Sequence, residues 1–300
     1  MKILLFGQSG QISWELQRSL VPLGEVIVLG SNSQPLCGNF TNLSGIAESI
    51  RAIQPDVIIN AAAHTAVDQI EKESDLAYQI NAYAPEVLAL EAKKIGALLV
   101  HYSTDYVFDG SGNQPWLETD QTNPLSTYAK TKLAAEERIT ASGCQYLIFR
   151  TSWVYAARGK NFAKTMLQLA AERDALSVIN DQIGAPTGAE LVADVTAHAL
   201  RTAMQNTSVA GIYHLTAKGE VSWFDYANFV LDYAIKKGLV LKLAPHDIKA
   251  VPTSEYPTPA QRPLNSRLNT QKLQQTFNIH LPLWQNGVAH MLDEYLERKS

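Results

Sequence analysis

The sequence has few cysteines, no excess of positive charge and no long apolar run. Cys37 and Cys144 are the only cysteines among 300 residues, which excludes a disulfide framework and a cysteine-based metal site. The formal net charge of −4 at pH 7 excludes the basic surface typical of nucleic-acid binding. No apolar run reaches the length of about 18 residues that a membrane span needs, and we expect no secretory signal. We therefore expect a cytoplasmic protein with no nucleic-acid or membrane partner.

The first half alternates short apolar runs with helical patterns. The predicted strands are Ile3–Phe6, Val26–Leu29, Val57–Ile59, Leu98–Tyr102 and Tyr146–Phe149. Between them lie segments with helical spacing, such as residues 76–95, and this alternation is typical of βαβ units. We predict an α/β fold with a Rossmann-type doubly wound parallel sheet, which binds ligands at the carboxyl ends of its strands.

The second half has fewer and shorter predicted strands, at Val178–Ile179 and Tyr213–Leu215. We expect residues 1–170 to form a dinucleotide-binding domain, to which some later segments return. Residues 171–300 would form a smaller mixed α/β substrate-binding domain. The proline-rich stretch 251–263 is incompatible with a helix interior or a central strand. It predicts a loop that carries Arg262 over the cleft between the two parts.

A glycine-containing turn directly follows the first predicted strand. Gly7 permits a tight turn, and Gly10 lets the backbone approach a pyrophosphate at the start of the next helix. This position favours a dinucleotide site over an ordinary strand-to-helix turn. The run Ala61-Ala62-Ala63 after the third strand would admit a flat ligand such as adenine, although tight packing explains it equally well. Neither a carboxylate nor an arginine ends the strand at 26–29, so the choice between NADH and NADPH stays open.

Three further residues predict a reductase. Thr104 follows the strand at 98–102, and Tyr128 and Lys132 lie one helical turn apart. An ammonium beside a phenol favours the phenolate, so we expect Lys132 to lower the pKa of Tyr128. Thr104 would polarise a substrate carbonyl, a nicotinamide would supply hydride, and Tyr128 would supply the proton. The alternative is an exposed helix that carries a partly buried tyrosine.

These motifs together resemble the extended short-chain dehydrogenase/reductase superfamily. Four segments are similar to the dTDP-4-dehydrorhamnose reductase family in particular: residues 101–108 (HYSTDYVF), 149–155 (FRTSWVY), 180–187 (NDQIGAPT) and 262–267 (RPLNSR). The resemblance implies reduction of the 4-keto group of dTDP-4-dehydro-L-rhamnose to dTDP-L-rhamnose. This is the last step in making activated rhamnose for surface polysaccharide such as O-antigen.

The resemblance also implies residue roles. Tyr128 would be the acid–base, Lys132 its partner and the anchor of the nicotinamide ribose, and Thr104 the polarising hydroxyl. Asp105, Trp153 and Arg262 would contact the substrate. With Gly7, Ala61 and Ala62 from the motifs above, the expected cofactor contacts are Gly10, Gln11, Ile12, Asn39, Phe40, Ala63, His64, Thr65, Tyr102, Tyr128 and Lys132. The family further implies a homodimer with Mg²⁺ bound by Glu15 and Glu190, although these could simply be solvated helix-end carboxylates.

Departures from the family pattern bear on the cofactor and on the alternatives. Ser13 replaces the usual third glycine. Gly30 and Asn39 stand where members often carry Asp, so we expect NADPH to be used at least as well as NADH. A dehydratase would read Thr-Asp-Glu where this chain has Thr104-Asp105-Tyr106. Three alternatives stay open: another NAD(P)-dependent nucleotide-sugar reductase, an epimerase, which retains its cofactor between turnovers, and a non-catalytic cofactor-binding regulatory subunit.

Overall fold

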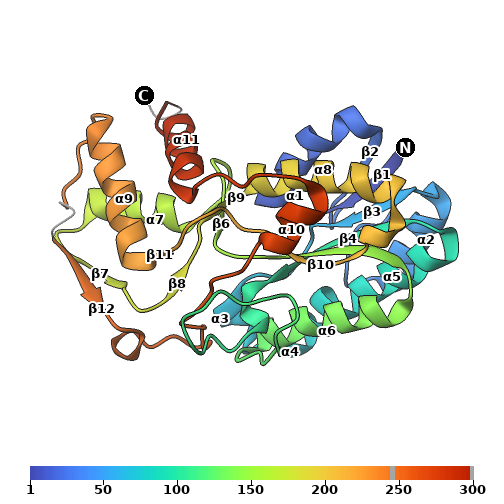
Figure 1. Cartoon of the computed structure of the whole chain (residues 1–300), viewed down its shortest axis with the longest axis horizontal. Helices are drawn as coiled ribbons and strands as arrows, with labels where there is room; N and C mark the ends of the chain where they lie inside the picture. Colours follow the sequence, from blue (N-terminus) through green and yellow to red (C-terminus); the bar gives the residue numbers. More distant parts are fainter. Residues whose placement is uncertain (244–246, 298–300) are drawn as a thin grey trace.

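A parallel sheet of six strands forms the centre of the protein (Figure 1). The computed structural model describes residues 1–243 and 247–297. The strand order is β10-β5-β4-β3-β1-β2, and each neighbouring pair is parallel. The strands are β1 (Lys2–Phe6), β2 (Glu25–Leu29), β3 (Val57–Asn60), β4 (Leu98–Thr104), β5 (Gln145–Thr151) and β10 (Gly211–His214). The predicted Rossmann-like α/β fold is confirmed.

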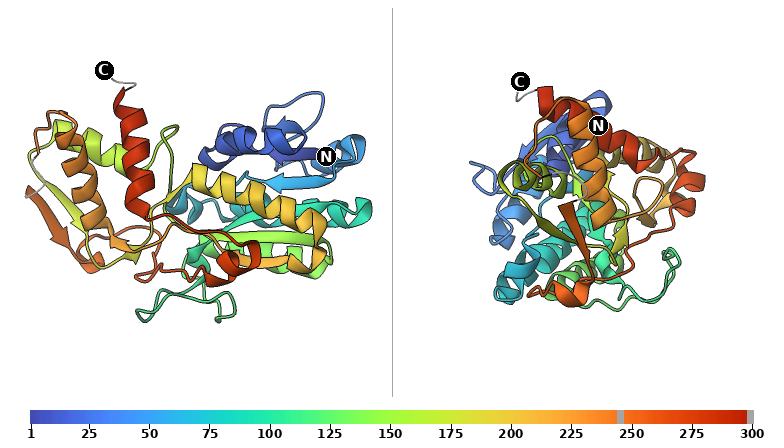
Figure 2. Two further views of the ribbon diagram at one scale, coloured as in Figure 1. Left: turned by 45° about the horizontal axis from the view of Figure 1, so that its top comes forward. Right: turned by 90° about the vertical axis from the view of Figure 1, so that its left-hand side faces the viewer.

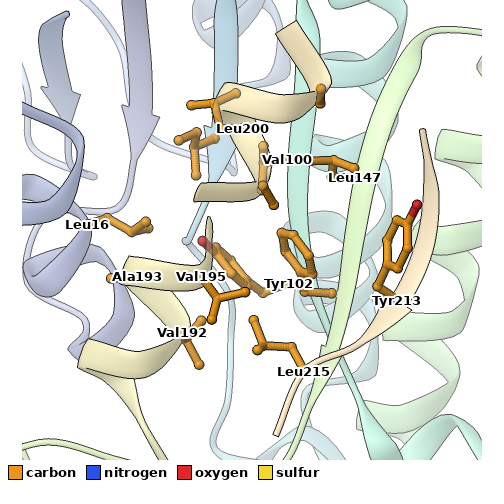
Figure 3. Close-up of a cluster of buried hydrophobic side chains, with 14 of the residues drawn as sticks. Leu16, Val100, Tyr102, Leu147, Val192, Ala193, Val195, Leu200, Tyr213 and Leu215 are labelled. Atoms are coloured by element: carbon orange, nitrogen blue, oxygen red, sulfur yellow. The ribbon is translucent and has the colours of Figure 1, made fainter. Parts of the chain in front are cut away.

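Helices cover both faces of this sheet because successive side chains of its strands point to opposite sides. Ile3 and Leu5 belong to one hydrophobic cluster, and Leu4 and Phe6 belong to another. Figure 3 shows the first cluster, in which Leu16 and Leu200 approach the sheet from two helices. The helices on this face are α1 (Gln11–Leu20), α8 (Ala189–Gln205) and α10 (Gln271–Phe277). Those on the other face are α2 (Leu43–Ile53), α5 (Ala84–Ile95) and α6 (Thr127–Ser142).

The helical segment predicted at 76–95 is interrupted. It consists of α4 (Ser74–Tyr78), a π-helical turn η2 (Gln79–Tyr83) and then α5. Pro85 lies in the first turn of α5, where its missing N–H is tolerated, and it could not continue a regular helix from α4. The wide turn places the buried Asn81 side chain against the backbone of His64 and the hydroxyl of Thr131. The interruption therefore ties the loop after β3 to α6.

A second group of elements builds its own hydrophobic cluster beside the sheet, at the left of Figure 1. Its strands form three two-stranded sheets, in which β7 pairs with β12, β8 with β11 and β6 with β9. The strands are β6 (Val154–Tyr155), β7 (Leu176–Ile179), β8 (Ile183–Gly184), β9 (Thr187–Gly188), β11 (Val221–Ser222) and β12 (Ile248–Val251). The helices are α7 (Phe162–Glu172), α9 (Trp223–Lys236) and α11 (Trp284–Glu297). Between these segments the chain returns to the large sheet with α8 and β10, as the turned views in Figure 2 show.

Short helical turns and loops connect these elements. They are η1 (Val21–Leu23), α3 (Val67–Ile70), η3 (Asp105–Val107), η4 (Thr207–Val209) and η6 (Thr253–Glu255). The proline-rich stretch leaves β12, passes through η6 and reaches the first part of the chain. There Asp68 of α3 accepts hydrogen bonds from the Ala260 N–H (3.2 Å) and from Arg262 (2.7 Å). Within residues 1–243 and 247–297, no helix combines the length and apolar character needed to cross a bilayer.

Candidate active site

The glycine turn connects β1 to α1 in a conformation that a side chain would disturb. Gly7 has a φ of +104°, and a Cβ atom there would lie 3.0 Å from the backbone of Ala61. Gly10 is the N-cap of α1 and provides no side-chain cap, and the first turn of α1 contains no acidic residue. The N–H groups at the start of α1 are therefore available to an anion. Ser13, at the third glycine position, is fully buried and donates to the Gly10 carbonyl (3.0 Å).

A cavity of about 700 Å³ lies at the carboxyl ends of β3, β4 and β5, next to this turn. It brings together most of the site residues predicted from the sequence. Those in its lining are Gly10, Gln11, Ile12, Ala61, Ala62, Ala63, Thr65, Tyr102, Thr104, Asp105, Tyr128, Lys132, Trp153 and Arg262. Residues that sequence reasoning missed also line it: Asn60, Val67, Ser103, Tyr106, Thr151, Ser152, Val154, Phe162 and Trp223.

Four predicted cofactor residues lie outside this lining. Gly7 forms the turn behind it. Phe40 is buried against Phe6, with ring centroids 5.5 Å apart. The Asn39 side chain accepts hydrogen bonds from the backbone and hydroxyl of Thr41. The ring of His64 contacts Glu73, with Nε2 and Oε2 3.0 Å apart.

Tyr128 and Lys132 share one face of α6 and both line the cavity. Ser126 begins the helix as its N-cap and accepts from the Ala129 N–H at 3.3 Å. The lowered pKa of Tyr128 predicted from the spacing is wrong for this structure. Burial raises the pKa of Tyr128, the Asp105 carboxylate raises it further, and the hydrogen bond with Thr104 lowers it only in part. The phenol is therefore held protonated, which suits a proton donor.

The close polar neighbour of the Lys132 ammonium is a histidine and not Tyr128. Nζ of Lys132 lies 3.3 Å from Nε2 of His101, a fully buried residue of β4. Burial lowers the pKa of Lys132 to about 8, although the charge of Glu136 raises it. The pKa of His101 is also well below its ordinary range, through burial and the nearby Lys132. The site therefore contains a lysine that titrates close to neutrality.

Thr104 and Asp105 form the polar end of β4. The Thr104 hydroxyl donates to Oδ1 of Asp105 at 2.9 Å and accepts from the Tyr106 N–H at 3.2 Å. Burial raises the pKa of Asp105 to about 6, against hydrogen bonds from Ser266 and Thr104 that lower it. The hydroxyls of Ser103 and Thr151, which also line the cavity, are buried and have no hydrogen-bond partner among the described residues. Such groups are available to a polar ligand.

Part of the cavity lining is aromatic. Trp153 stacks on Trp223 of α9, with centroids 3.5 Å apart and planes 12° apart. Trp153 has a φ of +48°, and a Cβ atom at Gly184 would meet its indole ring at 2.7 Å. Trp223 lies 70 residues further along the chain in the second group of elements, so no local pattern in the sequence points to it. A cavity lined by both aromatic rings and polar hydroxyls suits a ligand that combines a sugar with a base.

The predicted metal ligands Glu15 and Glu190 lie outside this cavity. Glu15 pairs with Arg18 (3.5 Å), and burial and the charge of Glu190 raise its pKa. Glu190 has His290 at 4.0 Å. The residues that the structure describes contain no group of three or more side chains able to hold a metal ion. The structure of one chain therefore gives no support for the predicted magnesium site.

Comparisons with known proteins match nearly the whole length of the chain. The family model described as RmlD substrate binding domain matches residues 1–297. The chain is 58% identical to dTDP-4-dehydrorhamnose reductase of Salmonella typhimurium over 294 residues, 98% of each protein. It is similar to the crystal structure of the Clostridium acetobutylicum enzyme of that name (TM-score 0.88, 36% identity, 99% and 100% of the chains). It is also similar to the Bacillus anthracis enzyme in complex with NADP (TM-score 0.86, 32% identity, 98% and 99% of the chains).

Proposed function

Because the chain belongs to the dTDP-4-dehydrorhamnose reductase family, we propose that it reduces the 4-keto group of dTDP-4-dehydro-L-rhamnose to dTDP-L-rhamnose with NAD(P)H. This is the final step in the synthesis of activated rhamnose. The observation that carries the proposal is one cavity that joins the start of α1 to Thr104, Tyr128 and Lys132. These residues supply the anion site, the carbonyl-polarising hydroxyl, the proton donor and the cation that such a reduction needs.

The cavity fits a nicotinamide dinucleotide. The open start of α1 suits a pyrophosphate, and the small side chains of Ala61, Ala62 and Ala63 leave room for a flat ligand beside it. Lys132 would hold the nicotinamide ribose. When bound, the nicotinamide supplies hydride to the substrate carbon. Since Gly30 and Asn39 replace carboxylates that would select the free 2′-hydroxyl, NADPH is used at least as well as NADH.

The chain's own residues supply the proton and the orientation. Thr104 and Tyr128 both line the cavity. Tyr128 can donate to the carbonyl oxygen, and the Thr104 hydroxyl does so as well once it turns away from Oδ1 of Asp105. Because burial raises its pKa, Tyr128 carries a proton at neutral pH and gives it to the oxygen as hydride arrives. Trp153 packs against the sugar or the base, and Arg262, held by Asp68, neutralises phosphate charge.

The alternatives from the sequence predict different site chemistry. A dehydratase needs a second carboxylate after Asp105. Tyr106 occupies that position, and its ring forms an edge-to-face pair with Tyr128 (centroids 6.1 Å apart). An epimerase would keep its cofactor through purification, whereas the reductase exchanges it. A non-catalytic subunit would bind the cofactor without turnover.

The test is consumption of NADPH by the purified protein with the dTDP-linked 4-keto sugar, followed by absorbance and by chromatography of the product. We expect turnover and release of NADP⁺, with slower turnover of the uridine diphosphate analogue. No loss of absorbance would reject the reductase and favour the non-catalytic subunit. Tightly retained cofactor and sugar isomerisation would favour the epimerase. A kcat/KM for NADH tenfold above that for NADPH would reject the cofactor preference.

The proposal includes the division of labour between the two parts of the chain and a homodimer. Residues 1–170, with the later segments that return to the sheet, bind the dinucleotide, and the remaining part binds the sugar. The reducing cytoplasm is its location, which two free cysteines suit. Sedimentation velocity with Mg²⁺ and with a chelator tests the assembly. A dimer that persists in the chelator would separate dimerisation from Glu15, Glu190 and magnesium.

A further inference from the structure

Lys132 is a buried cation that forms no ion pair with a carboxylate in residues 1–243 and 247–297. Its side chain lies on α6 and is 3% exposed. Glu136, whose charge acts on Lys132, is one turn along the helix and is bound by Arg150 through contacts of 2.7 to 3.2 Å. Among the described residues no carboxylate lies within ion-pair distance of Lys132, and its close polar neighbour is Nε2 of His101 at 3.3 Å.

The hydrogen-bond partner of Nδ1 decides which ring nitrogen of His101 carries the proton. The Ala62 N–H donates to Oδ1 of Asn60 at 3.1 Å, which fixes the orientation of that amide. The amide nitrogen of Asn60 therefore faces Nδ1 of His101, at 3.0 Å. An amide nitrogen only donates, so Nδ1 accepts and carries no proton. A neutral imidazole then carries its proton on Nε2, toward Lys132.

This arrangement places a donor against Lys132. An ammonium group has no lone pair to accept the Nε2–H, whereas a neutral amine has one. We propose that Asn60 locks His101 in the Nε2–H tautomer and that His101 thereby weakens the hold of Lys132 on its proton. Both are positioning residues for the reductase, and this role rests on the function proposed above.

Other groups around Lys132 act in both directions. Burial disfavours its charge, Glu136 favours it, and Arg150 offsets Glu136. Tyr128 and Asp105 face the same cavity from α6 and from the turn after β4. The lowered pKa of Lys132, about 8, agrees with the lock but does not separate it from burial.

A weakly held proton on Lys132 has a use in turnover. When Tyr128 gives its proton to the carbonyl oxygen, it becomes a phenolate. The Lys132 ammonium can return a proton to it, leaving an amine that takes one from solvent. An ammonium of lower pKa is the better donor in this step.

The tautomer can be measured without substrate. Long-range ¹H–¹⁵N NMR identifies which ring nitrogen carries the proton. We expect Nε2–H for His101, with His214 as an internal contrast, because its Nδ1 donates to the Trp116 carbonyl at 3.1 Å. Asn60→Asp keeps an acceptor for Ala62 but offers an oxygen to Nδ1, so His101 should switch to Nδ1–H. Finding Nδ1–H in the unmodified protein overturns the lock, even if Asn60→Asp fails to fold.

The consequence for Lys132 is measured in protein labelled with ¹³C at lysine Cε. Asn60→Asp and His101→Gln each offer an acceptor that can face the ammonium, so the pKa of Lys132 should rise by about 1 to 2 units. The alkaline limb of kcat/KM should move upward with it. His214→Gln removes an equally buried histidine away from the cavity and should move neither. An unchanged Lys132 pKa in His101→Gln overturns the proposal. If the unmodified protein shows no turnover but the Lys132 pKa still shifts in His101→Gln, the reductase function is rejected and the effect of His101 on Lys132 stands.

Discussion

Two regions of α6, one helical turn apart, bury charge in opposite ways. Lys132 faces the cavity and a neutral histidine, and its pKa is lowered to about 8. Glu136 is 2% exposed and holds the buried Arg150 through both carboxylate oxygens. Beside His101, Lys132 holds its proton weakly. The Glu136–Arg150 ion pair instead joins α6 to β5. A buried charge therefore serves chemistry here when it lacks a counter-charge and structure when it has one.

The largest effect should come from the cavity side of this comparison. Tyr128→Phe removes the proton donor and leaves the ring in place. We expect kcat to fall by about 10²–10⁴ while cofactor binding and the unfolding free energy change little. Steady-state kinetics, cofactor titration and urea unfolding provide the three measurements.

Tyr226→Phe is the matched control for this substitution. Tyr226 is also deeply buried, and its hydroxyl has no partner among the described residues, but it lies in the aromatic cluster of α9. Its kcat should equal that of the unmodified protein. Equal kcat in Tyr128→Phe would remove Tyr128 from the mechanism.

Loss of the Glu136–Arg150 ion pair should change the unfolding free energy of the protein. Glu136→Gln leaves Arg150 buried without a counter-charge, so the unfolding free energy should fall by about 3–5 kcal/mol. Glu86→Gln breaks a comparable pair with Arg138 in which both side chains are 36% exposed, and should cost at most about 1 kcal/mol. Urea unfolding of both variants makes the comparison. Equal losses would mean that burial does not set the value of the Arg150 pair.

The sequence predicts the sheet well because its signals are local. The central strands β3 and β4 each begin with an apolar run and are buried along their whole length. The helix break before α5 is harder to predict. The π-helical turn is held by contacts of Asn81 with His64 and Thr131, which are distant in sequence. Only the tertiary structure shows that a wide turn is favourable there.

The candidate site likewise contains residues that local sequence signals predict and residues that only the tertiary structure reveals. Thr104, Tyr128 and Lys132 could be predicted because strand ends and helical spacing place them together. Trp223 and His101 could not, because the partners that give them a role come from other elements. The pKa of Tyr128 was predicted with the wrong sign because spacing reveals a nearby ammonium but not the burial that outweighs it.

A third prediction concerns pH and a buried carboxyl at the cavity. Burial raises the pKa of Asp105 to about 6. Between about pH 4 and 6 the folded protein keeps a proton that the unfolded chain has lost, so its stability falls as the pH rises through this range. The loss should be about 3 kcal/mol. Asp105→Asn removes this titration, so urea unfolding across pH 4 to 7 should show a smaller decline than in the unmodified protein. Parallel curves would contradict the raised pKa.

The smallest effect should come from the ion pair that holds Arg262 of the cavity lining. We expect its effect on KM to depend on its position at the cavity more than on its length. Asp68 pairs with Arg262 at 2.7 Å and also binds the backbone of the proline-rich loop. Asp68→Asn should weaken this hold and raise KM for the sugar nucleotide by about two- to tenfold, because it loosens Arg262 without touching the proton donor. Glu220→Gln breaks a pair of equal length with Arg267, outside the cavity lining, and should leave KM unchanged. If both variants raise KM equally, the loop responds to charge in general, and Arg262 has no special position over the substrate.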